Sequence, residues 1–161
     1  MIGNDIIDLQ LAQLQSNWLR KGYLDKIFTD LEQHFILNSS DQNRQVWQLW
    51  SRKEAVYKLL LQKGIHKGYY PKKIKCTDIN LASGQVVFDN CIYYTTTFIS
   101  DNYIHSIAVL DKVDLNNIKH ITWDANCYKV NTIPYLKVNH TAINISKSHH
   151  GRFEQTVCLN F

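Results

Sequence analysis

Hydrophobic spacing in the first 64 residues predicts a short strand and then three helices. In and just before the strand segment GNDIIDL, the apolar Ile2, Ile6 and Ile7 lie around the polar Asn4 and Asp5. Apolar residues then recur three or four positions apart, which is the spacing of an amphipathic helix. Thr29 and Glu32 have the spacing of a capping box, and Gly22 and Gly64 are typical helix ends. The predicted elements are a strand at residues 3–9 and helices at about 9–22, 25–37 and 43–63.

After a basic loop the apolar period changes to two, which predicts an antiparallel meander. Turn-forming Ser-Gly and Asp-Asn pairs separate runs that are rich in β-branched and aromatic residues. The predicted strands are 73–81, 85–88, 91–99 and 103–110, with two more strands in 141–161 joined by a turn at SHHGR. Residues 111–133 are polar and predict no element. The pattern as a whole predicts an α+β fold, with helices packed on an antiparallel sheet.

Composition indicates the class of protein but does not identify its function. At 161 residues, 45% of them hydrophobic, the chain can form one globular domain or two small lobes. A net charge of +4 favours an anionic partner, such as a nucleic acid, a phosphorylated cofactor or an acidic protein. The four cysteines are far apart and form no C-x-x-C pair, which is typical of reduced thiols in the cytoplasm and argues against a zinc site. No signal peptide or apolar membrane segment is visible.

A carboxylate lies inside the apolar stripe of the helix predicted at 43–63. At about 100° per residue, Glu54 falls between Trp50 and Trp47, with Lys58 one turn further on at the edge of the stripe. Burial of an ionised carboxylate without a partner costs several kcal/mol or more. Two interpretations stay open: an ordinary surface pair of Glu54 with Lys58 at spacing i,i+4, and a metal ligand, since hard cations bind carboxylate oxygens.

A metal site needs a second carboxylate, and Asp5 is the candidate. It lies on the predicted first strand beside Gly3, where another backbone can approach closely. An aspartate at this place can equally be a turn or cap residue. That second interpretation is stronger for Asp8, because Leu9 begins a helical pattern directly behind it.

Four motifs, in order along most of the chain, resemble those of the 4′-phosphopantetheinyl transferase superfamily. GNDIIDL resembles its Gly-x-Asp strand, and IFTDLE resembles its F-T-x-x-E segment. WSRKEAVYKLL resembles its W-S-x-K-E-A-x-x-K helix, and SKSHHGRF resembles its S-x-S-H-x-G segment. The order of the motifs is most similar to that of short bacterial members, the holo-acyl-carrier-protein synthases.

The resemblance implies a magnesium-dependent reaction. The 4′-phosphopantetheine arm of coenzyme A would pass to a serine of an apo carrier protein, with release of adenosine 3′,5′-bisphosphate. Asp5 and Glu54 would bind Mg²⁺, which neutralises charge on the pyrophosphate. Glu54 would also accept the serine proton, while Lys58 would contact the phosphates and protonate the leaving phosphate. Ser148 and His149 would hold the phosphates of coenzyme A from the opposite side.

The resemblance also implies a partner and a layout. An acidic carrier protein, of the fatty-acid or polyketide type, would dock near Arg20 and Lys21 at the end of the first predicted helix. Residues 1–161 would form one transferase-like domain with pseudo-two-fold symmetry. Its main lobe would span 1–110, and a shortened second lobe at 111–161 would carry the Ser-His hairpin.

Several positions depart from the family pattern. Two alternatives to an active transferase stay open, one from these departures and one from the basic loop. Lys147 stands where an apolar residue is usual, Ile133 stands where glycine usually precedes the proline, and Ile7 stands where some members have a third carboxylate. The first alternative is a catalytically degenerate transferase paralogue. The second is a basic nucleic-acid-binding module. It would use the lysines of a loop that also contains two tyrosines, namely Lys63, Lys67, Lys72, Lys73 and Lys75 with Tyr69 and Tyr70.

Overall fold

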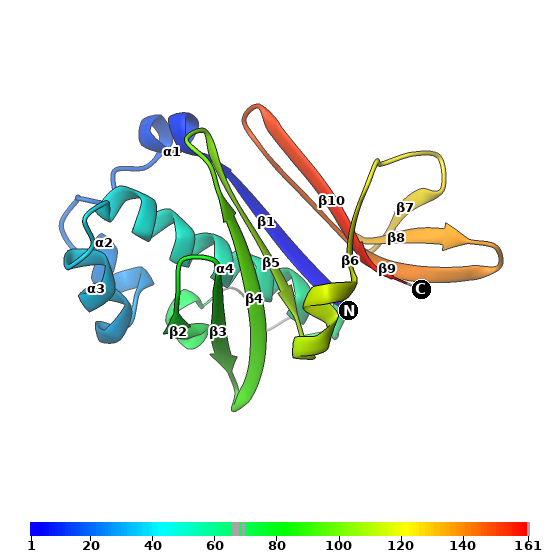
Figure 1. Ribbon diagram of the computed structural model, residues 1–161, viewed down its shortest axis with the longest axis horizontal. Coiled ribbons are helices and arrows are strands. Elements are labelled where there is room, and N and C mark those ends of the chain that lie inside the picture. The colour runs from blue at the N-terminus through cyan, green and yellow to red at the C-terminus, as the bar shows by residue number, and fades with distance from the viewer. Residues whose placement is uncertain (66–67, 69, 161) are drawn as a thin grey trace.

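The computed structural model describes residues 1–65, 68 and 70–160, which form two five-stranded antiparallel sheets (Figure 1). The first sheet has the order β1-β5-β4-β3-β2, and the second repeats that order as β6-β10-β9-β8-β7. The first contains β1 (Ile2–Asp8), β2 (Lys75–Ile79), β3 (Ser83–Phe88), β4 (Cys91–Ile99) and β5 (Tyr103–Val109). The second contains β6 (Ile118–Ile121), β7 (Cys127–Val130), β8 (Ile133–Val138), β9 (Thr141–His150) and β10 (Phe153–Leu159).

The helices distinguish the two halves of the chain. The four α-helices of the described residues all lie between β1 and β2, whereas residues 122–126 alone join β6 to β7. The helices are α1 (Leu9–Gln15), α2 (Tyr23–Ile27), α3 (Asp30–Leu37) and α4 (Gln42–Gln62), with short 3-10 helices η1 (Pro71–Lys73) and η2 (Lys112–Asn117). The prediction of an α+β fold with a shortened second lobe is therefore confirmed. The second lobe keeps its sheet and lacks the helical layer.

The long helix α4 packs across the first sheet and contacts β1 directly. Ala55, Val56 and Leu59 are fully buried in this interface. A Cβ atom at Gly3 would collide with the carbonyl oxygen of Ala55, so only glycine permits this close approach. The contact places the middle of α4 directly over the strand that carries Asp5.

In the second lobe, a tryptophan of the short β6–β7 connection packs beside a small apolar cluster of the sheet. Trp123 packs with Leu136 against the buried residues Cys127, Ile145 and Cys158. The ammonium of Lys147 lies 4.5 Å from the centre of the Trp123 indole, a cation–π distance, and 3.0 Å from a carboxylate oxygen of Glu154. The unusual lysine of the Ser-His segment thus has a local role in this lobe.

Two of the predicted helices had the wrong extent. The helix expected at 9–22 ends at Gln15, because Trp18 turns into the core and donates a hydrogen bond from its indole nitrogen to Asn43 Oδ1 (3.1 Å). The helix expected at 25–37 is divided into α2 and α3 at Phe28, where Thr29 begins α3 with the predicted capping box. The helix expected at 43–63 is confirmed as α4.

The strands of the first lobe and the last two strands of the second lobe were predicted, but the other three strands of the second lobe were not. β2 to β5 match the expected meander and β9 and β10 match the expected final pair, whereas β6, β7 and β8 were not predicted. The basic loop contains residues 66, 67 and 69, which lie outside the described part of the chain, and the predicted roles of Lys67 and Tyr69 lie there too. Within the described residues, no helix is both long and apolar enough to cross a membrane.

Candidate active site

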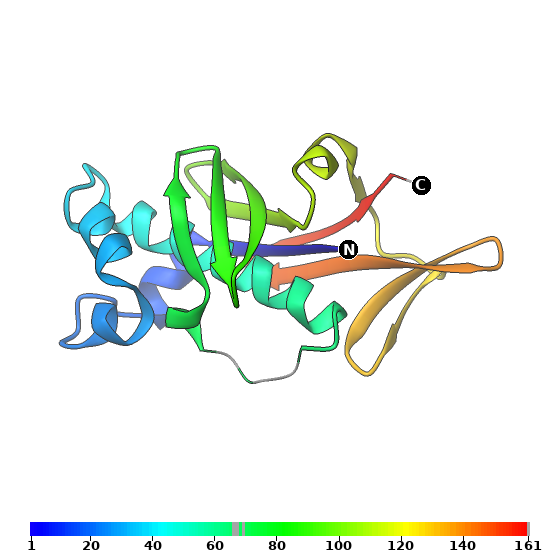
Figure 2. The same ribbon diagram turned by 90° about the horizontal axis from the view of Figure 1, so that it is seen from below.

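The two lobes meet where β9 lies beside β1 (Figure 1 and Figure 2). Side chains of β9 bond to backbone N–H groups of β1. β1 pairs with β5 along one edge only, so alternate N–H groups on its other edge need acceptors. Every second residue of β9 supplies one. Ser146 Oγ, Ser148 Oγ and His150 Nδ1 accept from the N–H groups of Asn4 (2.8 Å), Ile6 (2.8 Å) and Asp8 (2.9 Å) respectively.

Asp5, Lys58 and Ser148 form a buried polar cluster at this junction. Lys58 Nζ lies 3.0 Å from Asp5 Oδ1 and 3.2 Å from Ser148 Oγ, and the hydroxyl of Ser148 lies 3.4 Å from Asp5 Oδ1. Burial raises the pKa of Asp5 above its ordinary value, and the contacts with Lys58 and Ser148 oppose that shift without cancelling it. The carboxylate of Asp5 is therefore incompletely compensated by the protein, and additional positive charge would stabilise it.

A pocket of about 200 Å³ opens beside this cluster and contains Glu54. Trp47 and Trp50 flank Glu54 in the pocket wall, as the helical spacing predicted. The wall combines residues of β1, α1, α2, α4 and the tip of the β9–β10 hairpin, including Asp5, Gln15, Tyr23, Glu54, His149 and His150. A second pocket of about 240 Å³ continues past Lys58 between α4 and the second lobe, where it is lined by Ile133, Pro134 and Lys147 among others.

The predicted site residues thus lie together. Asp5, Glu54 and His149 share the first pocket, while Lys58 and Ser148 contact Asp5. No group of three or more metal-binding side chains occurs in the described residues. Two carboxylates nevertheless fit Mg²⁺, which usually takes one or two carboxylates and completes its shell with water and substrate phosphates.

The adjacent histidines differ in what they do. His150 accepts from the Asp8 N–H and lies 3.2 Å from Gln15 Oε1 through its other ring nitrogen, so it holds the hairpin to β1 and α1. The side chain of His149 is exposed and makes no hydrogen bond with the described residues. Of the two, His149 is the one available to a ligand.

Asp8 binds the hairpin tip and caps a helix. Its Oδ1 accepts from the N–H groups of Gln10 and Leu11 at the start of α1, while Arg152 binds both of its oxygens (2.8 and 2.9 Å). A Cβ atom at Gly151 would lie 2.6 Å from Asp8 Oδ2, so glycine is needed for this approach. The interpretation of Asp8 as a cap residue is confirmed.

We expect the contact between Asp8 and Arg152 to make the stability of the folded protein sensitive to acid. The hydrogen bonds from Arg152 are the main cause that holds the pKa of Asp8 well below its ordinary value of 3.8. A carboxyl whose pKa is lowered by folding stabilises the protein above that ordinary value, and the stabilisation is lost as the pH falls. Asp8→Asn should therefore lower the melting temperature at pH 7 and reduce the further drop between pH 4 and pH 2.5. An equal drop in Asp8→Asn and in the parent would contradict this role, and Asp124→Asn in an exposed loop is the control.

A second ion pair, which the sequence did not predict, supports α4 from behind. Lys53 and Glu32 are both fully buried and their charged atoms lie 2.8 Å apart. Lys53 Nζ also donates to the carbonyl oxygens of Pro71 and Ile74, each at 2.8 Å, and Glu32 accepts from the N–H of Cys76 at 2.7 Å. The lysine of the K-E-A motif therefore faces the core, while the adjacent glutamate faces the pocket.

Comparison with known proteins agrees with the family resemblance of the four sequence motifs. Residues 1–108 match the family model of the 4′-phosphopantetheinyl transferase superfamily. The structure resembles the holo-[acyl-carrier-protein] synthase of Helicobacter pylori in complex with coenzyme A, with a TM-score of 0.56, 16% identity, and coverage of 69% of this chain and 100% of that one. The synthase of Neisseria meningitidis gives a TM-score of 0.53 at 13% identity over 69% of this chain and 97% of its own.

One similar structure extends over the second lobe as well. The holo-[acyl-carrier-protein] synthase of Thermotoga maritima covers 99% of this chain and 83% of its own, with a TM-score of 0.52 and 11% identity. At such identities the likeness shows the fold. No curated protein matches the chain by sequence.

Proposed function

The chain belongs to the 4′-phosphopantetheinyl transferase superfamily, and we propose that it transfers the 4′-phosphopantetheine arm of coenzyme A to a serine of an apo carrier protein. The observation that carries the proposal is the junction of the lobes. Asp5, Glu54 and Lys58 of the first lobe meet Ser148 and His149 of the second around one cleft. Two solved structures with this fold, from Helicobacter pylori and Chronobacterium ammoniagenes, are complexes with coenzyme A.

The chemistry assigns a separate task to each charged residue. Glu54 accepts the proton of the carrier serine, whose oxygen then attacks the β-phosphorus of coenzyme A. The bond from that phosphorus to the bridging oxygen breaks, and adenosine 3′,5′-bisphosphate leaves. Lys58 donates a proton or a hydrogen bond to the leaving phosphate, and His149 binds phosphate from the side of the second lobe.

The donor set also fits a magnesium ion. Asp5 and Glu54 would hold it, because Asp5 lacks full compensation of its charge and Glu54 lines the same pocket. When bound, Mg²⁺ supplies neutralisation of the charge on the pyrophosphate.

The direct test is transfer itself. Purified protein, coenzyme A, Mg²⁺ and an apo acyl carrier protein should give a carrier whose mass increases by one phosphopantetheine group, and chelation of the metal should stop the reaction. Coenzyme A with Mg²⁺ should also raise the melting temperature. Stabilisation without transfer to any carrier would favour a degenerate paralogue. Salt-dependent binding of oligonucleotides, with no effect of coenzyme A, would favour the nucleic-acid-binding alternative.

The carrier would dock beside the cleft. Arg20 and Lys21 are exposed in the loop before α2, and Arg20 lies 5.1 Å from the ring centre of Tyr23, which lines the pocket. Reversal of both charges should raise KM for an acidic carrier severalfold with little change in KM for coenzyme A, because rim charges act mainly on association. Equal increases for both substrates would contradict this docking surface.

The domain would be complete within one chain. Residues 1–110 and 111–161 would supply the two sides of the same cleft. The shortened second lobe would thus provide the side of the site that a neighbouring subunit could provide in an oligomer. We expect a mixture of Glu54→Gln and His149→Ala proteins to stay inactive, because neither chain contains an intact site. Recovery of activity on mixing, with a mass near three chains by light scattering, would instead indicate a site shared in a trimer.

A further inference from the structure

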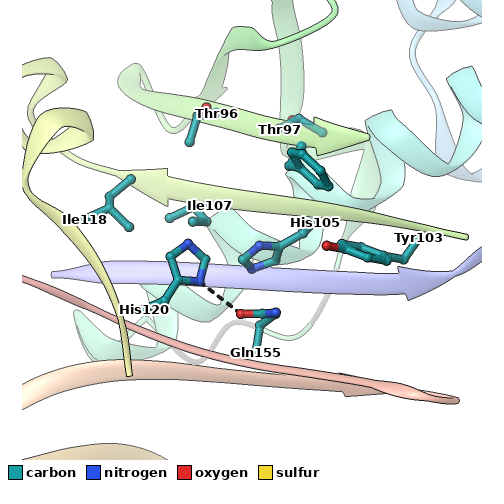
Figure 3. Close-up of a pocket in the computed structure, with 9 residues that line it drawn as sticks. Thr96, Thr97, Tyr103, His105, Ile107, Ile118, His120 and Gln155 are labelled. Atoms are coloured by element: carbon teal, nitrogen blue, oxygen red, sulfur yellow. Dashed lines mark hydrogen bonds between the residues drawn. The ribbon is translucent and has the colours of Figure 1, made fainter. Parts of the chain in front are cut away.

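A larger pocket lies on the opposite face of β1 from the candidate active site. Asp5 points into the active-site cluster, whereas Asn4 points to His105, and successive side chains of a strand lie on opposite faces. The pocket has a volume of about 490 Å³ and lies between β4 and β5 of the first sheet and β6 and β10 of the second (Figure 3). Its walls are Thr96, Thr97, Phe98, Tyr103, His105, Ile107, Ile118, His120 and Gln155.

Hydrogen bonding fixes the proton on His105. Asn4 Nδ2 lies 3.1 Å from the carbonyl oxygen of Gln155, which can only accept, so this atom is the amide nitrogen. The same Nδ2 lies 3.0 Å from His105 Nε2 and donates to it, so the neutral ring carries its proton on Nδ1. His105 is only 4% exposed, and within the described residues its Nδ1 has no recorded partner. An N–H donor of a residue that lines the pocket is therefore left for a ligand.

His120 offers the complementary group. Its Nδ1 lies 3.0 Å from Gln155 Oε1 and donates to it, which leaves Nε2 of the neutral ring as an acceptor. The ring centres of His105 and His120 lie 5.6 Å apart, and Figure 3 shows the two rings side by side in the wall. A donor and an acceptor are therefore close enough to bind adjacent atoms of one small molecule.

The remaining wall is uncharged and combines apolar with neutral polar side chains. Phe98 is 59% exposed and its ring centre lies 5.7 Å from that of Tyr103, while Ile107 and Ile118 cover the base of the pocket. None of the lining residues is an aspartate, glutamate, lysine or arginine. Burial, together with the nearby His120, lowers the pKa of His105 to about 4, so this ring stays neutral at physiological pH. Such a wall selects against phosphates and favours neutral aromatic ligands.

We propose that this pocket is a second binding site, for an uncharged aromatic carboxamide. The carbonyl oxygen of the ligand accepts from His105 Nδ1–H, its amide N–H donates to His120 Nε2, and its ring lies against Phe98 and Tyr103. Each hydrogen bond to a buried group is typically worth a few-fold to about tenfold in affinity. The site shares no lining residue with the active-site pocket, so its ligand binding can be tested separately from the transferase reaction.

Nicotinamide is a suitable probe, and nicotinate is the matched control. In a titration followed by NMR, nicotinamide should cause saturable shifts of the His105 and His120 imidazole signals, with little change around Glu54. Nicotinate has a charged carboxylate and no amide N–H, so it should bind at least threefold more weakly. Nicotinamide shifts that never saturate, or nicotinate binding of equal affinity, would overturn the proposal.

A variant separates this site from adventitious binding. His120 is exposed, so His120→Ala should fold normally and weaken nicotinamide binding about threefold to tenfold through loss of one hydrogen bond. His34→Ala removes an exposed histidine from α3 and should leave the affinity unchanged. Unchanged affinity in His120→Ala would contradict the site, whatever the outcome of the carrier-transfer assay.

Discussion

Glu54→Gln should abolish most of the transfer to carrier protein while the fold is retained. The amide has the same shape as the carboxylate, but it neither accepts the serine proton nor carries charge for a divalent metal. General acid–base catalysis alone typically contributes about 10²–10⁴-fold to a rate. We therefore expect a decrease of at least about a hundredfold in kcat, measured by mass spectrometry of the carrier at saturating coenzyme A. The melting temperature and circular dichroism should stay close to those of the parent.

Two further variants make the result specific to Glu54. Asp101→Asn removes a carboxylate whose side chain is fully exposed in a turn, so it should leave kcat unchanged. Asp5→Asn should resemble Glu54→Gln and should also weaken the dependence of the rate on Mg²⁺ concentration. Near-normal turnover in Glu54→Gln would contradict the role proposed for this residue.

The sequence predicted the first lobe better than the second for a physical reason. Long amphipathic segments such as α4 repeat their pattern over several turns, and capping residues such as Thr29 mark their ends. β6 and β7 have only four residues each, which is too short for an alternating pattern to stand out. The early end of α1 also escaped prediction, because it depends on the packing of Trp18 against distant residues of α4.

The candidate site could be predicted in its chemistry but not in its contacts. Helical spacing alone put Glu54 between two tryptophans, and the family resemblance paired it with Asp5 of β1. The hydrogen bonds from β1 to Ser148 and His150 join residues more than 140 positions apart, and no local pattern reveals such pairs. These bonds mean that Ser148 has a structural task besides any contact with phosphate.

The pairing of Lys53 with Glu32 was missed although both residues lie in recognised motifs. Each lies among apolar neighbours, and a buried charge requires a partner of opposite sign. That requirement alone could have linked the F-T-x-x-E segment to the K-E-A helix. It also explains why two charged residues follow each other on α4: Lys53 is fully buried in the core, and Glu54 lines the cleft.

Lys53→Met should therefore be the most destabilising of these substitutions. It leaves the carboxylate of Glu32 fully buried without its cation, and it also removes donors to the carbonyl oxygens of Pro71 and Ile74. Loss of one partner of a buried pair typically costs about 3–5 kcal/mol. We expect a decrease of that size in the free energy of unfolding, measured by urea denaturation. Exposed Lys26 provides the control, since Lys26→Met should change stability by less than about 0.5 kcal/mol.

The double variant Lys53→Met/Glu32→Gln distinguishes the ion pair from simple loss of packing. Neutral glutamine has a single side-chain oxygen, so it can accept from the N–H of Thr29 or of Cys76 but not from both. It no longer buries an unpaired charge, however, and an unpaired buried charge costs more than one lost hydrogen bond. The double variant should consequently be more stable than Lys53→Met alone. If it is less stable, or if Lys53→Met costs under about 1 kcal/mol, the pair does not hold α4 against α3 and β2 in the way inferred here. Because Glu54 is the next residue on the helix, a shift of α4 in Lys53→Met should also lower the transfer rate of the protein that remains folded.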